Sequence, residues 1–165
     1  MSKNERSGWA VLSVLLLATA STAAAQDKGC VELKTVAEVE QQYTNEQGQK
    51  ASRLVPAEKV VPGNEVVWTI TARNVCDKPV ADVVIANPVP EHMTFVAGSA
   101  LGVGTDIQYS IDGKAFAAPA SLTVREVDGS SRNARPDEYR AVRWTYKAAF
   151  PAGTTAFVRY RALVK

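Results

Sequence analysis

The clearest strand in this chain has the sequence Val66-Val67-Trp68-Thr69-Ile70-Thr71-Ala72-Arg73. Its even-numbered side chains are apolar and its odd-numbered ones are mostly polar, so one face is suited to burial and the other to water. Residues 142–147 and 158–164 alternate in the same way. Helical periodicity is nearly absent from the chain. This pattern predicts an all-β protein whose strands bury one face.

Other segments extend the same reading. Strands are expected at residues 31–43, 50–55, 80–86, 93–96, 107–111, 114–116 and 122–127. Turn residues separate them, most clearly Pro62-Gly63, Asp112-Gly113 and Pro151-Ala152-Gly153. Residues 97–105 and 128–138 are interpreted as loops. About eight to ten short strands of this kind predict an immunoglobulin-like β-sandwich, with an up-and-down barrel as the structural alternative.

The first twenty-five residues resemble a secretory signal peptide. Lys3 and Arg6 are followed by an apolar run from Trp9 to Ala18 and by Ala23-Ala24-Ala25, a pattern that signal peptidase accepts. The run is about ten residues long, whereas a membrane span needs about twenty. We therefore expect a mature chain that starts at Gln26, has no transmembrane span and is periplasmic or extracellular. Residues 26–56 are expected to form a strand extension packed on a sandwich domain of residues 57–165.

Charge disfavours nucleic acid as a partner. The whole chain has a formal net charge of +2, and the loss of Lys3, Glu5 and Arg6 with the leader reduces it to +1. Neutralisation of phosphates requires a distinctly basic surface, which this balance does not offer.

Two cysteines, Cys30 and Cys76, remain after processing. In an exported protein such a pair is most simply a disulfide. By the chain-entropy relation, closing a loop of this length stabilises the fold by roughly 4 kcal/mol. A metal site would need further ligands, and the only histidine is His92, for which a surface position is expected.

A resemblance to a known family rests on several short motifs. They are Val61-Pro62-Gly63-Asn64-Glu65-Val66-Val67-Trp68-Thr69-Ile70, Lys78-Pro79-Val80-Ala81-Asp82-Val83-Val84-Ile85, Asn87-Pro88-Val89-Pro90, Phe95-Val96-Ala97-Gly98-Ser99, and Trp144 with Pro151-Ala152-Gly153. Over residues 57–165 the chain resembles domain of unknown function number eleven, an immunoglobulin-like repeat domain of bacterial envelope proteins, in a single copy. The resemblance implies an exported structural or binding module without catalytic residues. Asn64 and Asn87 stand where that family more often carries aspartate, which removes carboxylates from any cation site.

No motif of catalysis or cofactor binding is found. Nucleophile motifs and phosphate-binding glycine signatures are missing from the sequence. Asp106, Asp112 and Asp128 lie in or beside turns, where aspartate caps its own backbone. We therefore assign no catalytic, cofactor-binding or metal-binding residue. Three aromatic side chains at inward positions are expected to fill the core rather than to stack on carbohydrate: Trp68, Trp144 and Tyr160.

A group of basic side chains is the remaining candidate for a binding site. Its members are Arg143, Lys147, Arg159 and Arg161, which share a face if the last two strands pair with each other. In the favoured interpretation Glu32, Glu38 and Glu40 neutralise this face. The alternative is a patch for an anionic envelope glycan or an acidic envelope protein.

These observations favour a non-catalytic envelope module with a structural or adhesive role. One alternative is a pilus-type or fibre subunit that donates its N-terminal strand, residues 31–43, to a neighbour. An enzyme with a site in residues 128–138 is a third hypothesis. A lysine–asparagine cross-link that joins Lys34 or Lys59 to Asn74 or Asn87 is a further hypothesis, which the intact mass of the protein tests.

Overall fold

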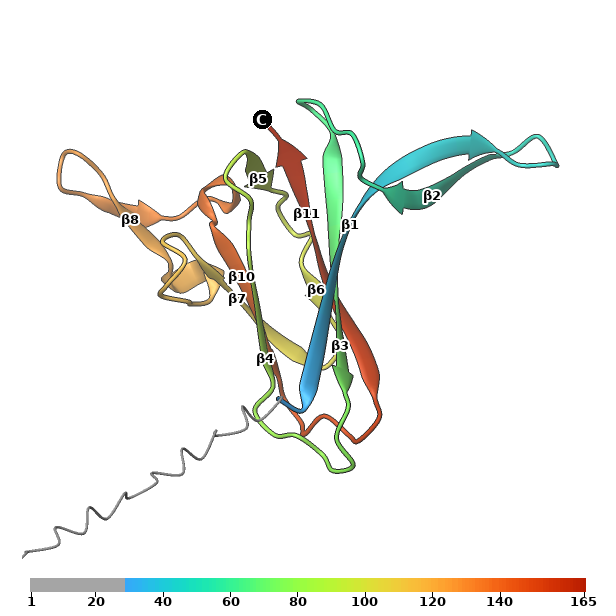
Figure 1. Cartoon of the computed structure of the whole chain (residues 1–165). Helices are drawn as coiled ribbons and strands as arrows, with labels where there is room; N and C mark the ends of the chain where they lie inside the picture. Colours follow the sequence, from blue (N-terminus) through green and yellow to red (C-terminus); the bar gives the residue numbers. More distant parts are fainter. Residues whose placement is uncertain (1–28) are drawn as a thin grey trace, which may run out of the picture.

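The computed structural model describes residues 29–165, and the expected leader therefore lies outside the described part. The described residues form eleven strands and two short 3-10 helices (Figure 1). The strands are β1 (Val31–Thr44), β2 (Lys50–Pro56), β3 (Glu65–Asn74), β4 (Val84–Pro88), β5 (Met93–Phe95), β6 (Leu101–Gly102), β7 (Thr105–Ser110), β8 (Thr123–Arg125), β9 (Ser131–Asn133), β10 (Ala141–Tyr146) and β11 (Thr155–Val164). The 3-10 helices are η1 (Pro119–Ser121) and η2 (Pro136–Glu138).

The larger sheet has six strands and is built around β3. Its strand order is β2-β1-β3-β11-β5, and β6 also pairs with β11. Both β1 and β11 run antiparallel to β3, with Trp68 opposite Ala37 on one side and Tyr160 on the other. The strand that is clearest in the sequence thus lies in the middle of this sheet, where its even-numbered side chains face the second layer.

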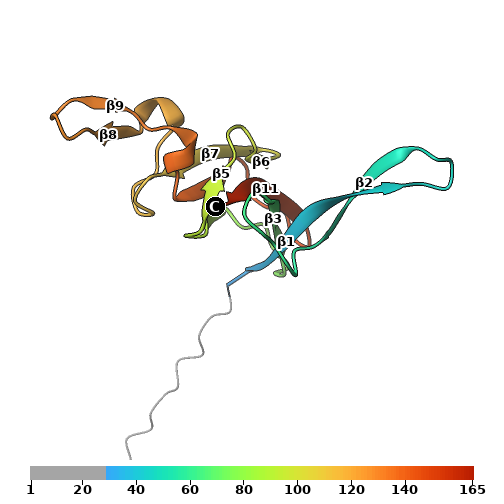
Figure 2. The same cartoon turned by 90° about the horizontal axis from the view of Figure 1, so that it is seen from above.

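The smaller sheet has the strand order β4-β10-β7 and covers part of the larger one (Figure 2). The expected pairing of the last two strands is therefore wrong. β10 lies between β4 and β7, whereas β11 lies beside β3 in the other layer. The cause is the connection of residues 147–154, which is long enough to cross the ~10 Å between two packed sheets instead of making a tight hairpin.

The core lies between the two sheets and confirms the predicted all-β sandwich. Trp144 from the smaller sheet and Tyr160 from the larger one are both fully buried, with ring centroids 6.2 Å apart. Trp68 is partly buried and stacks on Tyr160 at 6.4 Å. These aromatic side chains fill the core, as predicted. The Tyr160 hydroxyl also joins the layers, because it donates to the carbonyl of Pro88 and accepts from the Asn87 amide, each at 2.9 Å.

One glycine allows close packing between the layers. A Cβ atom at Gly102 would lie 2.7 Å from Oγ1 of Thr105, 2.8 Å from Cδ1 of Trp144 and 3.0 Å from Cγ1 of Val158. Only a residue without a side chain fits there, and this places the short strand β6 against the core.

Two ribbons project from the sandwich in both views (Figures 1 and 2). The first, which we call the arm, is the hairpin of residues 40–54, where β1 is the only neighbour of β2 among the described strands. The second is the hairpin of β8 and β9. The first part of β1, up to Val39, is by contrast an ordinary strand of the larger sheet. Within residues 29–56, β1 therefore contributes both to the sandwich and to the arm.

Several strand boundaries differ from the sequence-based expectation. The strand expected at residues 80–86 begins only at Val84, because Asp82 adopts a left-handed backbone with φ 54°. Residues 114–116 turn back without forming a strand, although Ala117 bridges to Tyr109. The polar segment 128–138 is not a loop throughout, since it contains β9 and η2, and the loop 97–105 contains β6.

Candidate functional site

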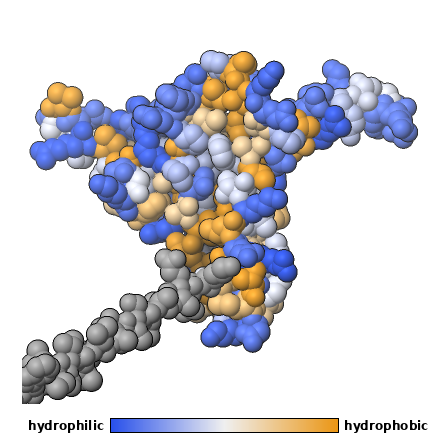
Figure 3. Space-filling model, viewed as in Figure 1, coloured by the Kyte–Doolittle hydropathy of each residue, from blue (hydrophilic) through white to orange (hydrophobic). Residues whose placement is uncertain are grey.

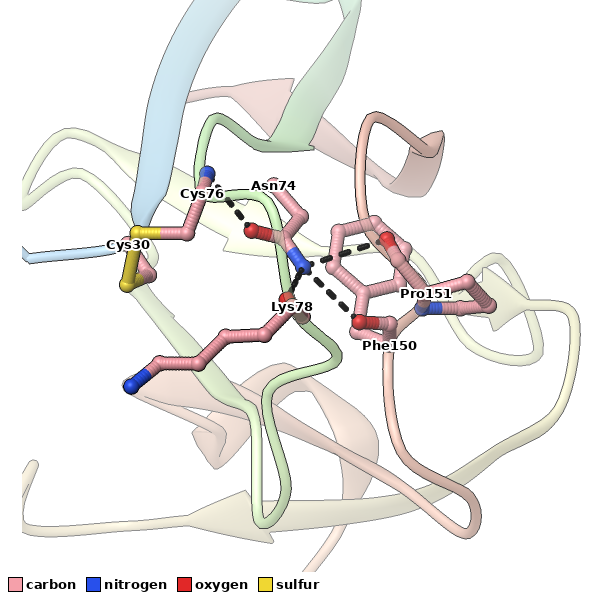
Figure 4. Close-up of a disulfide and its surroundings, with 6 residues drawn as sticks. All are labelled: Cys30, Asn74, Cys76, Lys78, Phe150 and Pro151. Carbon is pink, nitrogen blue, oxygen red and sulfur yellow. Dashed lines mark hydrogen bonds between the residues drawn. A yellow bond between two sulfur atoms is a disulfide. The ribbon is translucent and has the colours of Figure 1, made fainter.

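The predicted disulfide is present and closes one end of the sandwich. Cys30 and Cys76 are joined with an S–S distance of 2.05 Å and a Cα–Cα distance of 5.2 Å (Figure 4). Cys30 directly precedes β1, and Cys76 follows β3, the strand with which β1 pairs. The bond therefore secures the beginning of β1 to its neighbour.

Asn74 forms a hydrogen-bonding centre beside this disulfide. Its side chain is fully buried, and its amide nitrogen lies within 2.9–3.1 Å of the carbonyls of Lys78, Phe150 and Pro151 (Figure 4). Its Oδ1 accepts from the backbone N–H of Cys76 at 3.0 Å. One side chain thus ties together the turn after β3 and the turn before β11. An asparagine at a strand end before a turn is a recognisable signal in the sequence, but it does not reveal the acceptors Phe150 and Pro151, which are distant in sequence.

The four basic residues proposed as a patch do not share a face. Arg143 lies on β10 and Lys147 directly follows it, whereas Arg159 and Arg161 lie on β11 in the other sheet. Both pairs point away from the core, on opposite layers of the sandwich. The structure thus corrects the single basic face that a hairpin of the last two strands would have made.

On the larger sheet, Arg161 is balanced by carboxylates. Its Nη1 lies 2.7 Å from Glu65 and 3.5 Å from Glu40. The hydrogen bond that Arg161 donates to Glu65 and the weaker contact with Glu40 raise the pKa of Arg161. Hydrogen bonds from Ser52 and Arg161 lower the pKa of Glu40. Of the three glutamates expected to neutralise the basic face, Glu40 is the one that forms an ion pair within residues 29–165.

The other three basic side chains also have partners within the chain. Arg159 donates to Oγ1 of Thr69 at 3.0 Å and lies over the ring of Phe157. Arg143 donates to the side chain of Gln108 and lies 4.6 Å from the ring centroid of Phe116. Nζ of Lys147 lies 2.9 Å from Asp106. Lys147, like Arg161, is therefore paired with a carboxylate, whereas Arg143 and Arg159 are held by neutral side chains and keep an unbalanced charge within residues 29–165.

Residues 128–138, the hypothetical enzyme site, are held by an ion-pair network. Arg132 on β9 contacts Glu126 and donates to both oxygens of Glu138, at 2.6 and 2.7 Å. Hydrogen bonds from Arg132 and from the backbone of Arg135 lower the pKa of Glu138 to about 2. A carboxylate that stays ionised to such low pH is poorly suited to general acid catalysis at neutral pH.

Two of the three turn aspartates, Asp112 and Asp128, cap their own backbone as predicted, whereas Asp106 lies within β7 and contacts Lys147. Oδ1 of Asp112 accepts from the backbone N–H groups of Lys114 and Ala115, and these bonds, with one from Ser110, lower its pKa to about 2. Oδ1 of Asp128 accepts from Ser130 in the same manner. His92 is exposed. Among the described residues, no group of three or more histidine, cysteine, aspartate or glutamate side chains is arranged to hold a metal ion.

Comparison of the chain with known protein families, with curated proteins and with solved structures yields no match. Within residues 29–165, no helix has the length and apolar character of a membrane span.

Proposed function

We propose that this protein is an exported, non-catalytic module of the bacterial cell envelope that acts by binding another envelope component. The proposed location is the periplasm or the extracellular space. The Cys30–Cys76 disulfide supports export, because such bonds persist mainly in oxidising compartments. The proposal includes an immunoglobulin-like domain related to domain of unknown function number eleven, on the motifs of residues 57–165.

The arm is the single observation that carries a binding role. A two-stranded ribbon with no third strand is only marginally stable by itself in water. The arm nevertheless projects from the sandwich, and most of its side chains are exposed. Its surface is mostly hydrophilic in Figure 3. Such an element contributes little to the core, so a contact with an envelope protein or glycan is the role that best accounts for it.

A pull-down from envelope extract tests this proposal. The bait is the exported, oxidised protein, and the comparison is a variant in which Asn-Gly replaces residues 42–52. This replacement joins Gln41 to Arg53, which already face each other in the hairpin. We expect the complete protein to retain a partner that the shortened variant loses, whereas Val127→Ser at the tip of the other ribbon keeps it. Equal capture by all three proteins, or capture by none, would contradict the proposal.

The alternative of a fibre subunit that donates its N-terminal strand has less support. Residues 31–39 pair with β3 and residues 38–44 pair with β2 within the same chain. Donation to a neighbour would require that these pairs separate while Cys30 remains bonded to Cys76. Size-exclusion chromatography of the exported, oxidised protein distinguishes the two: a ladder of oligomers favours the fibre subunit, whereas a sharp monomer peak favours the simple module.

A further inference from the structure

The first part of β1 has a neighbour on one side only. β3 pairs with residues 31–39, whereas β2 begins its pairing on the opposite side at Glu38. The backbone N–H of Ala57 bonds to the carbonyl of Ala37 and marks the end of that contact. In the part of the chain that the structure describes, no strand lies beside residues 31–35 on this side. We call these five residues the free edge of β1.

Alternation of hydrogen bonds decides which groups the free edge presents. The N–H of Val75 donates to the carbonyl of Cys30 at 2.8 Å, which makes residues 30 and 75 a hydrogen-bonded pair. In an antiparallel ladder every second residue bonds to the same neighbour. Even-numbered residues of β1 therefore bond to β3. The N–H and C=O groups of Val31, Leu33 and Thr35 point to the free edge.

Other edges of the sheets carry features that discourage a further strand. β4 is short, with the left-handed Asp82 before it and Pro88, which lacks an N–H, at its end. β2 carries Lys50 at one end and Pro56 at the other. The free edge of β1 has no proline and no left-handed residue. At its centre is an apolar side chain, Leu33, which is 53% exposed.

The uneven width of the two sheets explains this exposure. The smaller sheet has three strands and the larger one six, so β1 extends beyond its cover. Leu33 and Val84 line a shallow hollow between the beginning of β1 and the segment before β4. Val84 is itself 50% exposed. Figure 3 shows apolar residues gathered over this lower part of the body.

We propose that the free edge of β1 pairs with the same edge of a second copy of this chain. The two strands run antiparallel, with Leu33 opposite Leu33 across a two-fold axis. Val31 then faces Thr35 of the second copy, so that all the unpaired backbone groups of both edges meet. The larger sheets of the two copies become one continuous sheet. This is a closed, self-complementary contact of the kind that most protein dimers use.

The charges of Glu32 and Lys34 favour a second copy of the chain as the partner of the free edge, and they favour this register. On the outer face, Glu32 of one copy lies opposite Lys34 of the other, and the reverse pair forms at the symmetric position. Opposite charges at facing positions stabilise a sheet, whereas like charges destabilise it. A shift by two residues in one direction would place Glu32 opposite Glu32, and a shift in the other would place Lys34 opposite Lys34. An edge strand that carried charges of one sign only would repel a second copy of itself. The free edge of β1 carries one charge of each sign and does not.

The contact is small, and the dimer is expected to be weak. Five residues on each side supply about six backbone hydrogen bonds. Interfaces of this size belong to the transient class. The proposal depends on the free edge alone and not on the arm, so it and the proposed binding role can fail independently.

Sedimentation equilibrium of the exported, oxidised protein from about 1 µM to about 1 mM tests the proposal, since this range brackets weak association. We expect a monomer–dimer equilibrium. Lys34→Glu places glutamates opposite each other at both symmetric positions and should weaken the dimer about tenfold or more. Adding Glu32→Lys to Lys34→Glu restores opposite charges and should recover most of the association. Glu38→Lys is the matched control. Glu38 lies on the same face of β1 as Lys34, but at a position where β2 already pairs with β1.

Thermal melting of each variant separates loss of the dimer from loss of the fold, which matters because Glu32 faces Arg73 within the chain. A Leu33→Cys variant gives a second readout. Facing residues in a hydrogen-bonded antiparallel pair have Cα atoms about 5.5 Å apart, within disulfide range. Mild oxidation should therefore link two copies through residue 33, whereas the exposed control Phe157→Cys should remain largely monomeric. A monomer at every concentration, equal association of Lys34→Glu and the double variant, or equal cross-linking of both cysteine variants would overturn the proposal.

Discussion

Removal of the Asn74 side chain should destabilise the protein more than any other single change at a polar residue that we consider. Asn74 is fully buried, and its amide serves three backbone carbonyls while its oxygen accepts from the N–H of Cys76. In Asn74→Ala all four bonds are lost: the carbonyl of Lys78 and the N–H of Cys76 are left unpaired, whereas the carbonyls of Phe150 and Pro151 keep bonds from Val80 and Thr154. The two turns that they belong to lie at the end of the sandwich that also carries the disulfide (Figure 4).

The magnitude follows from the four lost hydrogen bonds, two of which leave a backbone group without any other partner. A hydrogen bond contributes about 1 kcal/mol net, and a buried group left unpaired costs about 1–3 kcal/mol. Lys78 and Pro151 are exposed residues, so water can replace part of the loss at their carbonyls. We therefore expect a loss of about 3 kcal/mol in the free energy of unfolding. For a domain of this size that corresponds to a fall in Tm of about 10 °C.

Differential scanning calorimetry of the oxidised protein at pH 7 measures this effect. The control is Asn133→Ala, since Asn133 is an exposed asparagine on β9. We expect the control to melt within about 1 °C of the unmodified protein, as for most surface substitutions. If Asn74→Ala melted as the control does, with its disulfide intact, the argument that this amide holds the two turns together would be refuted.

Three further predictions follow from the fold. Replacing Cys30 and Cys76 by serine should cost roughly 4 kcal/mol, because the cysteines are 46 residues apart in sequence, and urea unfolding with and without the bond measures the difference. Gly102→Ala should cost about 1–3 kcal/mol because its Cβ has no room, whereas Gly29→Ala, with nothing within 4 Å of the added atom, should be neutral in the same assay. The pKa of Glu138 in the folded protein, about 2, lies below its unfolded value, so its ion pairs stabilise the β8–β9 ribbon above about pH 5 and are lost as the pH falls towards 2. Hydrogen exchange in residues 123–138 should therefore show weaker protection at pH 3 than at pH 7, relative to protection in β3, and unchanged relative protection would contradict this assignment.

Much of the local structure could be predicted from residue patterns. The alternation in residues 66–73 marked both a strand and its buried face, because side chains on a strand alternate with period two. Asp112 was recognised as a turn residue from its chemistry, and its hydrogen bonds confirm this. The disulfide was also predictable, since two cysteines allow only one intramolecular pairing.

The candidate site was harder to predict. The grouping of Arg143 with Arg159 depended on a hairpin that does not form, because residues 147–154 cross between the layers. Strand β9 was missed because Ser131-Arg132-Asn133 has no apolar alternation, and its order depends on the ion pairs of Arg132. The role of Asn74 could not be anticipated either, since its acceptors Phe150 and Pro151 lie far away in sequence.

The amino-acid sequence by itself determined most of the strand segments, the buried faces of the clearest ones and the pairing of the two cysteines. The strands and their buried faces depend on residues that are neighbours along the chain. The disulfide follows because two cysteines can pair in only one way. Only the tertiary structure decided that β10 and β11 belong to different sheets, that β2 leaves the sandwich, and that β1 retains a free edge. Many strand pairings satisfy the same alternation, and the choice among them depends on how the whole set of side chains packs into one core.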